Sequence, residues 1–462
     1  MSPPDWNGRA FQVGGESHAA EAPHTPEAPR SLGTHEDPGP LGDPVLPLSL
    51  FGGFGVEIEY MIVDAETLDV RPFADKLMEA VHGEVVAEFE AGTISWSNEL
   101  VLHVLELKTN GPTNELPGLD GPFLREVHRA NAALAEMGCA LLPGGMHPWM
   151  DPVREARIWP HEYTEVYRTF DRIFSCRGHG WANLQSTHLN LPFSGDREFA
   201  ALHSAIRAIL PLLPALAASS PIAEGQVTES LDHRLVEYAR NARRIPSVTG
   251  AVIPEQAGTE GEYRTNILAR IYRDLAPLDP QGHLRHEWVN ARGAIARFDR
   301  GAIEIRLLDP QECPAADIAV LAAVVEVIRA LCARVLEGDE TVPDLATPVL
   351  AGILDDTVRA AEEARICDHQ YLEALGIPAP GRSRRASEVW AILLESCGAL
   401  DRVSRGFQDS EGHSPLEIIM SRGTLARRIV GLTGRAPSRS RLREVYHELG
   451  HCLAGNRGFT EG

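Results

Sequence analysis

The sequence predicts an α+β fold, in which the strands come first along the chain and the helices follow. Alternation of apolar and polar residues, the pattern of strands, recurs between residues 55 and 310. From residue 316 onward the apolar residues recur with the period of an α-helix. This order favours an α+β fold over the regular succession of strand and helix that builds a parallel sheet.

The individual segments follow from the same periodicities and from turn signals between them. The expected strands are residues 57–63, 97–109, 139–142, 181–191 and 294–308, the last folded as a hairpin at Asp299-Arg300-Gly301. The expected helices are residues 76–82, 121–138, 164–174, 198–218, 316–337, 356–375, 386–402, 416–432 and 438–454.

Composition divides the chain of 462 residues into three regions. Residues 1–44 are rich in Pro, Gly, His and Glu and lack an apolar period, so we expect a disordered tail. Residues 45–340 contain the predicted strands and would form the core. Residues 341–462 would form a helical region packed on that core. A chain of this length suggests two or three domains, although one enlarged domain with insertions also fits.

The charge of the chain restricts its partners. A formal net charge of −22 argues against a nucleic-acid-binding protein, which normally presents a basic face. It is compatible with a nucleotide substrate, because a bound cation supplies positive charge locally. Lys76 and Lys108 are the only lysines, and the G-x-x-x-x-G-K-[ST] pattern of a P-loop is absent. Arginine and metal would therefore hold any phosphate.

The cysteines and the apolar runs predict a cytoplasmic protein with no membrane segment. The seven cysteines are scattered and form no C-x-x-C pair, which fits a reducing compartment. No run of 18 apolar residues occurs, and no signal peptide is evident at the N-terminus.

Two glutamates stand side by side on the first predicted strand. Glu57 and Glu59 alternate with Val56, Ile58 and Tyr60, so both carboxylates share one face, about 7 Å apart by strand geometry. Like charges so placed repel unless a cation or solvent separates them. The pair alone therefore fits either a site for a divalent cation or an edge strand with one solvated face.

Other predicted strands also present acids, together with one histidine. Glu106 shares a face with Leu102 and Val104, whereas Glu99 has the opposite parity and must lie at a bend to reach the same site. His188, Glu304 and Arg306 lie on later strands. So many acids need several divalent cations, Mg²⁺ or Mn²⁺, with oxygen ligands and one imidazole. Such sites suit phosphoryl transfer from ATP, with Arg306 as a clamp for the γ-phosphate.

Six short segments occur in a distinctive order: residues 55–59 (GVEIE), 105–109 (LELKT), 144–148 (GGMHP), 186–190 (STHLN), 217–222 (AASSPI) and 302–309 (AIEIRLLD). Together they resemble the successive motifs of glutamate–cysteine ligase family 2, the carboxylate–amine ligases, between about residues 50 and 330. The resemblance implies a glutamine-synthetase-like fold, in which a curved antiparallel sheet flanked by helices forms an active-site funnel. Residues 45–340 would then be the catalytic core of an ATP-dependent ligase.

The resemblance also implies roles for individual residues. The implied metal ligands are Glu57, Glu59, Glu99, Glu106, His188 and Glu304. Arg306 would contact phosphate and, with Glu304, serve catalysis. The substrate side would be lined by Ser219 and Ser220, and the candidates for binding nucleotide or substrate carboxylate are Arg243, Arg264, Arg292 and Arg297. Two segments depart from the family's pattern: Tyr60 replaces a frequent acid, and residues 185–190 replace a Gly-x-His-x-His-x-Gly motif.

The implied reaction joins glutamate to cysteine through a γ-glutamyl phosphate and forms γ-glutamylcysteine, a step of glutathione biosynthesis. Transfer of phosphate from ATP makes the γ-carboxylate reactive, and the amine then attacks it. The expected partners are small molecules, and a homo-oligomer is compatible with the sequence. A different amine or carboxylate, joined by a ligase of the same family, remains an alternative.

One further motif competes with this interpretation. Residues 447–451 (HELGH) match H-E-x-x-H, the zinc-protease signature. On a helix, His447 and His451 would point away from the apolar stripe of Leu442, Val445 and Leu449. No histidine follows them, so a third ligand would have to come from upstream. The motif thus leaves a zinc-binding hydrolase as a weaker alternative.

Overall fold

The computed structural model describes residues 48–378 and 383–460. The expected disordered tail, residues 1–44, lies outside the described residues. None of the helices in the described ranges is both long enough and apolar enough to cross a membrane.

One antiparallel sheet forms the centre of the protein, with the strand order β2-β3-β4-β1-β6-β10-β9. β5 pairs with the second half of β1, beyond the part that pairs with β6. The strands are β1 (Gly55–Asp64), β2 (Glu88–Ala91), β3 (Ile94–Asn98), β4 (Val104–Thr109), β5 (Cys139–Leu142), β6 (Thr187–Pro192), β9 (Ala294–Arg297) and β10 (Ala302–Leu308). Short pairs are formed by β7 (Ile222–Ala223) with β8 (Gln226–Val227), and by β11 (Arg365–Ile366) with β12 (Arg384–Arg385).

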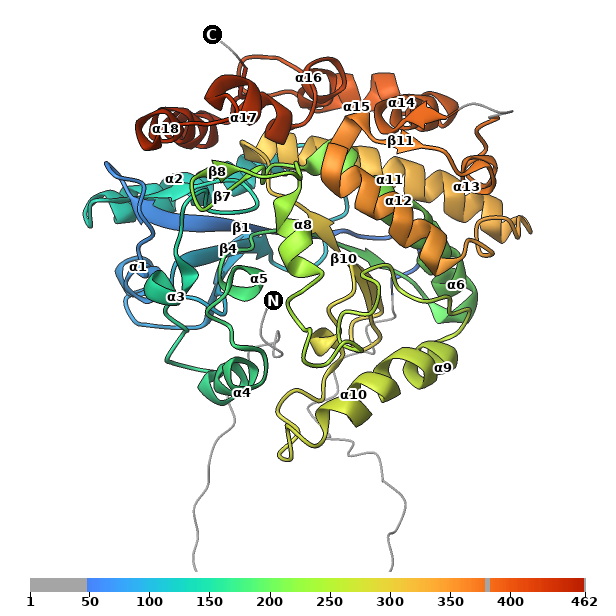
Figure 1. Ribbon diagram of the computed structural model, residues 1–462, viewed down its shortest axis with the longest axis horizontal. Helices are drawn as coiled ribbons and strands as arrows, with labels where there is room; N and C mark the ends of the chain where they lie inside the picture. Colours follow the sequence, from blue (N-terminus) through green and yellow to red (C-terminus); the bar gives the residue numbers. More distant parts are fainter. Residues whose placement is uncertain (1–47, 379–382, 461–462) are drawn as a thin grey trace, which may run out of the picture.

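Helices cover one face of this sheet. α6 and α7 contact β10, α2 contacts β3 and β5, and α11 contacts both α2 and α6. In Figure 1 α2 and α11 lie above β1, and α6 lies at the right-hand side of the molecule. The helices before α11 are α1 (Ala74–His82), α2 (Asp120–Ala135), α3 (Pro152–Glu155), α4 (Thr164–Phe174), α5 (His179–Ala182), α6 (Gly195–Ile209), α7 (Pro214–Ala217), α8 (His233–Tyr238), α9 (Glu260–Tyr263) and α10 (Ala269–Leu275). Three short helical turns, η1 (Leu210–Leu212), η2 (Arg264–Leu268, a π-helix) and η3 (Glu287–Val289), complete this part.

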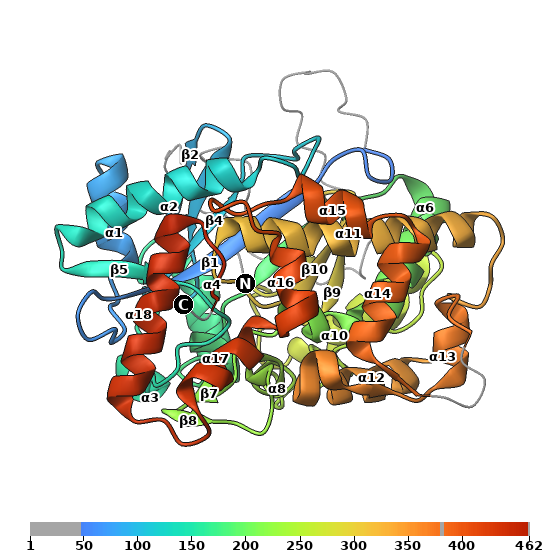
Figure 2. The same cartoon turned by 90° about the horizontal axis from the view of Figure 1, so that it is seen from above.

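The C-terminal helices form a second layer on top of the first. α14, α15 and α16 contact α11, and α18 contacts α2; Figure 2 shows them lying across the molecule from above. α11 itself spans Pro314–Leu336. The elements that follow it are α12 (Thr347–Ala360), η4 (Ala361–Glu363), α13 (His369–Ala374), α14 (Ala386–Ser396), α15 (Leu400–Gly406), α16 (Pro415–Arg422), α17 (Leu425–Thr433) and α18 (Arg439–Gly455). α17 and α18 share an apolar cluster with Met61 and Val63 of β1. A domain boundary at residue 340 stays a prediction.

Several predicted elements agree with the structure and others need correction. The helix over residues 164–174 is α4, and the hairpin over 294–308 is β9 and β10. The single helix expected over 356–375 is wrong, because α12 ends before Ala361, whose φ is +49°. The helix expected over 198–218 ends at Ile209 and continues as η1 and α7, since Pro211 and Pro214 remove backbone donors.

Two strand predictions were too long. In the segment 181–191 only the second half is a strand, β6, and the first residues belong to α5. The segment 97–109 is divided between β3 and β4 by a turn at residues 102–103. Glu99 lies between these two strands, so the bend required by its parity is confirmed.

Candidate active site

The pairing of four strands gathers acidic and basic side chains on one face of the sheet. Glu57 on β1 lies opposite Lys108 on β4 and opposite His188 on β6. Glu59 lies opposite Glu106. Directly opposite residues of an antiparallel pair share a face, so these side chains point the same way. The other face of β1 carries Val56, Ile58 and Tyr60, which are fully buried against the helices.

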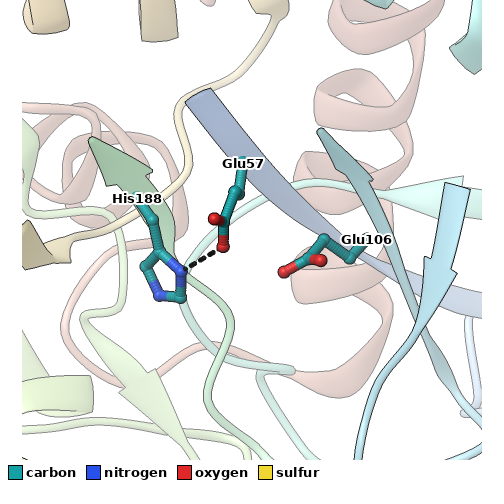
Figure 3. A group of neighbouring side chains, drawn as sticks. All are labelled: Glu57, Glu106 and His188. Atoms are coloured by element: carbon teal, nitrogen blue, oxygen red, sulfur yellow. Dashed lines mark hydrogen bonds and ion pairs between the residues drawn. The ribbon is translucent and has the colours of Figure 1, made fainter. Parts of the chain in front are cut away.

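The first group of potential metal ligands consists of Glu57, Glu106 and His188. One ligand atom of each lies within 4.8 Å of the others, and all three side chains are buried. Figure 3 shows them reaching toward a common point from three neighbouring strands. His188 Nδ1 lies 3.0 Å from Glu57 Oε2.

A second group shares Glu106 with the first. Glu59, Glu99 and Glu106 also bring one carboxylate oxygen each within 4.8 Å of the others. Glu99 reaches this position from the connection between β3 and β4, whereas the other two lie on strands. The structure therefore brings together five of the six residues expected to hold metal, and their role as ligands stays a prediction.

Hydrogen bonds fix the orientation of these ligands. Ser186 Oγ lies 2.8 Å from His188 Nε2, and the Ser186 amide donates to Glu59 Oε2 over 2.9 Å. Asn190 Nδ2 donates to Glu57 Oε1 over 3.1 Å. The His188 ring is thus held at both nitrogens, by Glu57 and by Ser186. Ser186 and Asn190 lie outside the ligand groups, and outer contacts of this kind orient metal ligands and tune their basicity.

The pKa values of the glutamates show an excess of buried negative charge. Burial, together with the nearby charges of Glu57 and Glu99, holds the pKa of Glu106 well above its usual range. Burial and Glu99 also raise the pKa of Glu59. Burial alone would raise the pKa of Glu57, but the hydrogen bond and charge of His188 outweigh it and lower that pKa. Clustered carboxylate oxygens, plus one imidazole, fit divalent cations such as Mg²⁺ or Mn²⁺.

Glu304 occupies a different position from the other acids. Its Oε1 accepts a 2.5 Å hydrogen bond from Arg306 Nε, and its Oε2 lies 3.5 Å from Arg297 Nη1. It lies outside both three-ligand groups found in the described ranges, although Oε1 is 3.9 Å from His188 Nδ1. The geometry makes Glu304 the partner of two arginines, and metal binding by it stays a prediction.

Arg306 lies at the edge of the acidic groups and is buried. Burial acts to lower its pKa, but Glu304 and Tyr238 raise it above the usual value, so the guanidinium remains charged. A permanently charged guanidinium beside clustered carboxylates can bind the phosphates of a nucleotide whose negative charge cations partly neutralise.

The other predicted arginines lie in varied surroundings. Arg292 is buried and donates to both carboxylate oxygens of Glu255, at 2.5 and 2.7 Å. Arg264 is half exposed and pairs with Glu260 and Glu287, and Arg243 is exposed. Arg297, by contrast, is buried, and its Nη1 lies 3.5 Å from Glu304 Oε2. Their roles in substrate binding stay predictions.

Ser219 and Ser220 are buried and already engaged within the protein. The Ser219 amide and Ser220 Oγ each donate to Asp309 Oδ2 over 2.8 Å. Ser219 Oγ accepts from the Gly145 amide over 2.9 Å. Their side chains thus order the loop that precedes β7, and contact with substrate stays a prediction.

Sequence reasoning missed the residues that support the acids. Lys108 Nζ lies 3.8 Å from Glu106 and donates to Glu88 over 2.8 Å. Ser97 Oγ donates to Glu106 Oε1 over 2.5 Å. Lys108 and Asn190 stand two residues after Glu106 and His188, so the same strand parity that indicated the acids could have indicated them.

The H-E-x-x-H segment lies on α18, away from these groups. His447 Nε2 lies 3.1 Å from the Glu66 carbonyl, and His451 is exposed and pairs with Glu448 at 3.5 Å. Neither histidine belongs to a three-ligand group among the residues that the structure describes. The geometry therefore gives the zinc-hydrolase alternative no support.

Residues 53–402 match the sequence model of glutamate–cysteine ligase family 2. A protein of uncharacterised function from Archaeoglobus fulgidus is 37% identical over 276 residues, which cover 60% of this chain and 74% of that protein. A protein of Nocardioides sp. with the provisional name glutamate–cysteine ligase 2-1 is 26% identical over 280 residues, 58% of this chain. The match covers 65% of that relative, just under two thirds of its length.

Two solved structures share the fold. The glutamate–cysteine ligase of Francisella tularensis in complex with AMP has a TM-score of 0.54 and 12% identity, covering 88% of this chain and 89% of its own. A bifunctional glutathione synthetase from Pasteurella multocida has a TM-score of 0.53 and 16% identity, covering 87% of this chain and 52% of its own. The expected glutamine-synthetase-like fold is thereby confirmed. The family model matches more than half of this chain. The chain therefore belongs to glutamate–cysteine ligase family 2 and is an ATP-dependent ligase that forms a C–N bond.

Proposed function

We propose that this protein is a glutamate–cysteine ligase, which joins the γ-carboxylate of glutamate to the amine of cysteine at the expense of ATP. The observation that carries the proposal is the pair of buried ligand groups that share Glu106, next to the charged Arg306. Acidic sites that hold several divalent cations are suited to binding ATP and transferring its terminal phosphoryl group.

Six side chains would take part in holding cations and phosphate. Glu57, Glu106 and His188 would hold one Mg²⁺ or Mn²⁺, and Glu59 and Glu99 would hold a second together with Glu106. When bound, such cations would neutralise the charge that develops on the phosphate in the transition state. Arg306 would contact the γ-phosphate, and Glu304 would orient the guanidinium of Arg306 through their 2.5 Å hydrogen bond.

The reaction would proceed in two steps. A γ-carboxylate oxygen of glutamate forms a bond to the γ-phosphorus of ATP as the bond to the β,γ-bridging oxygen breaks, which gives γ-glutamyl phosphate and ADP. The neutral amine of cysteine then attacks the acyl carbon, the C–O bond to phosphate breaks as the C–N bond forms, and the nitrogen gives up one proton, which leaves with the phosphate or to solvent. The first step brings two anions together, so Arg306 contributes by screening their repulsion.

Several similarities support this assignment. The family is named for glutamate–cysteine ligation, and the related Francisella structure contains AMP. A role in the cytoplasm, in a route to glutathione with small-molecule substrates, belongs to the same proposal. The departure of residues 185–190 from the family's histidine motif favours, as a second candidate, a ligase of this family that uses another amine.

The test is a coupled assay of the purified protein with ATP, Mg²⁺, glutamate and a panel of amines that includes cysteine. We expect release of ADP and phosphate, and a γ-glutamyl dipeptide with cysteine identified by mass spectrometry. Product with another amine and none with cysteine would select the second candidate. No ADP release with glutamate and any amine of the panel would contradict both candidates.

A further inference from the structure

The Asp309 carboxylate, just beyond the end of β10, is the centre of a buried hydrogen-bond cluster. Its Oδ2 accepts from the Ser219 amide and from Ser220 Oγ, each over 2.8 Å. Its Oδ1 accepts from Arg234 Nε of α8. Asp309 and Arg234 are both 1% exposed. A buried ion pair of this kind requires full hydrogen bonding on both sides to offset its desolvation.

A second loop approaches the same carboxylate at Gly145. A Cβ atom added there would lie 2.5 Å from Asp309 Cγ, so only glycine permits this approach. The Gly145 amide donates to Ser219 Oγ over 2.9 Å, and its carbonyl accepts from the Gln185 amide over 2.9 Å. The loops at residues 145 and 219 are therefore both packed on Asp309.

The same ion pair reaches the backbone of Arg306. The pairing of β10 with β6 shifts register between Ile305 and Leu308, which takes Arg306 out of the regular ladder. Arg234 Nη1 and Nη2 donate to the Arg306 carbonyl over 3.3 and 3.4 Å. On the other edge, the Arg306 amide donates to the Gly293 carbonyl over 2.9 Å. Arg234 thus holds the carbonyl of Arg306 at the position where the regular pairing of β6 with β10 is interrupted.

We infer that Arg234 and Asp309 form a positioning pair for the ATP phosphates, which aims the Arg306 guanidinium and orders the loop of Ser219 and Ser220. The inference rests on the proposed function, because it needs a phosphate at Arg306. The planar guanidinium of Arg234 binds Asp309 and the Arg306 carbonyl at once, and a lysine ammonium lacks the fork that makes both contacts.

The test uses two variants that avoid an unpaired buried charge. Arg234→Gln combined with Asp309→Asn removes both charges, and Arg234→Lys keeps the charge but not the fork. We expect both proteins to fold by circular dichroism. Because small displacements of catalytic groups have large effects, we expect kcat to fall about 100-fold in the double variant and at least about tenfold in Arg234→Lys, with the KM for the amine changed less than about threefold. Affinity for a non-hydrolysable ATP analogue with Mg²⁺, measured by calorimetry, should fall about tenfold.

Arg428 and Glu312 provide a matched control. They form a second buried ion pair, 2.7 Å long, which connects α17 to the segment before α11. Arg428→Gln combined with Glu312→Gln should lower the melting temperature about as much as the Arg234 and Asp309 double variant while leaving kcat and analogue affinity unchanged.

Two results would overturn the inference. One is wild-type affinity for the ATP analogue in both Arg234 variants, and the other is an equal loss of kcat and analogue affinity in the Arg428 control. Failure of the proposed function gives a different result, in which the wild-type protein releases no ADP with any substrate pair. The analogue titrations do not require turnover, so they would still compare the variants with the wild type.

Discussion

Glu59 of β1 lies directly opposite Glu106 of β4, so two buried glutamates are neighbours across an antiparallel pair. Like charges in directly opposite positions destabilise a sheet. The raised pKa of both carboxyl groups reflects their burial and the charges around them. An arrangement that costs stability in the free protein is typical of a binding site, since a bound cation removes the repulsion.

We therefore expect Glu106→Gln to abolish the stabilisation of the protein by divalent cations. Without metal, the variant should match the stability of the wild type within about 1 kcal/mol, because burial already favours the neutral form of Glu106 and Ser97 Oγ can still donate to the amide oxygen. With Mg²⁺ or Mn²⁺, only the wild type should gain melting temperature. Differential scanning calorimetry after dialysis against EDTA measures both effects.

The raised pKa of Glu106 also gives metal binding a pH dependence. The cation displaces the proton of this carboxyl, so affinity for Mn²⁺ should increase as the pH rises, with release of protons. Titrations in two buffers of different ionisation enthalpy detect that release. Affinity for Mn²⁺ that is independent of pH, or unchanged in Glu106→Gln, would contradict the assignment of Glu106 as the shared ligand.

Glu304→Gln should abolish turnover without unfolding the protein. The substitution removes the negative charge that orients Arg306 and Arg297 but keeps an acceptor oxygen of the same size. Steady-state ADP release and circular dichroism measure the two properties. Glu363→Gln, in a half-exposed pair with Arg385, is the control and should be fully active. Activity near the wild-type rate in Glu304→Gln would mean that turnover requires neither metal binding by Glu304 nor its orientation of Arg306 and Arg297.

His203 should make the protein sensitive to acid. Its ring is buried on α6 between Phe199 and Tyr263, at 5.3 and 5.7 Å, and burial lowers its pKa to about 3. Its depressed pKa contributes stability that is present above the unfolded value of 6.5 and is lost as the pH falls toward 3. At pH 5 this loss amounts to about 2 kcal/mol.

The check is His203→Phe, which keeps an aromatic ring but cannot titrate. The free energy of unfolding is measured by urea denaturation at pH 8 and at pH 5. It should fall between these two pH values in both proteins, and the fall should be about 2 kcal/mol smaller in the variant. Equal decreases in the two proteins would show that His203 titrates in the folded state near its ordinary pKa.

The two histidines of α18 should be dispensable. His447→Ala combined with His451→Ala removes both potential zinc ligands; His447 is hydrogen-bonded to the Glu66 carbonyl, and His451 pairs with Glu448. We expect unchanged ligase activity and a change in the free energy of unfolding of at most about 0.5 kcal/mol. Loss of activity in this variant, with activity retained in Glu57→Gln, would revive the zinc interpretation.

The local patterns of the sequence were sufficient to predict which residues share a face. Along β1 and β10 the side chains alternate with a period of two, which is a property of the extended backbone alone. The same period required a bend at Glu99, and the structure has one between β3 and β4. Helix ends were less accurate, because Pro211 and the positive φ of Ala361 interrupt segments whose apolar period continues.

Only the tertiary structure decided three contacts: Glu59 opposite Glu106, Lys108 with Glu88, and Arg234 with the Arg306 carbonyl. Each joins segments that are far apart along the chain. Their register depends on how the apolar faces pack together, and a shift of one residue would turn every acid toward the helices. Alternation thus determined the kind of chemistry that one face of the sheet can support, and packing determined which acids could share a cation and which arginine lies beside them.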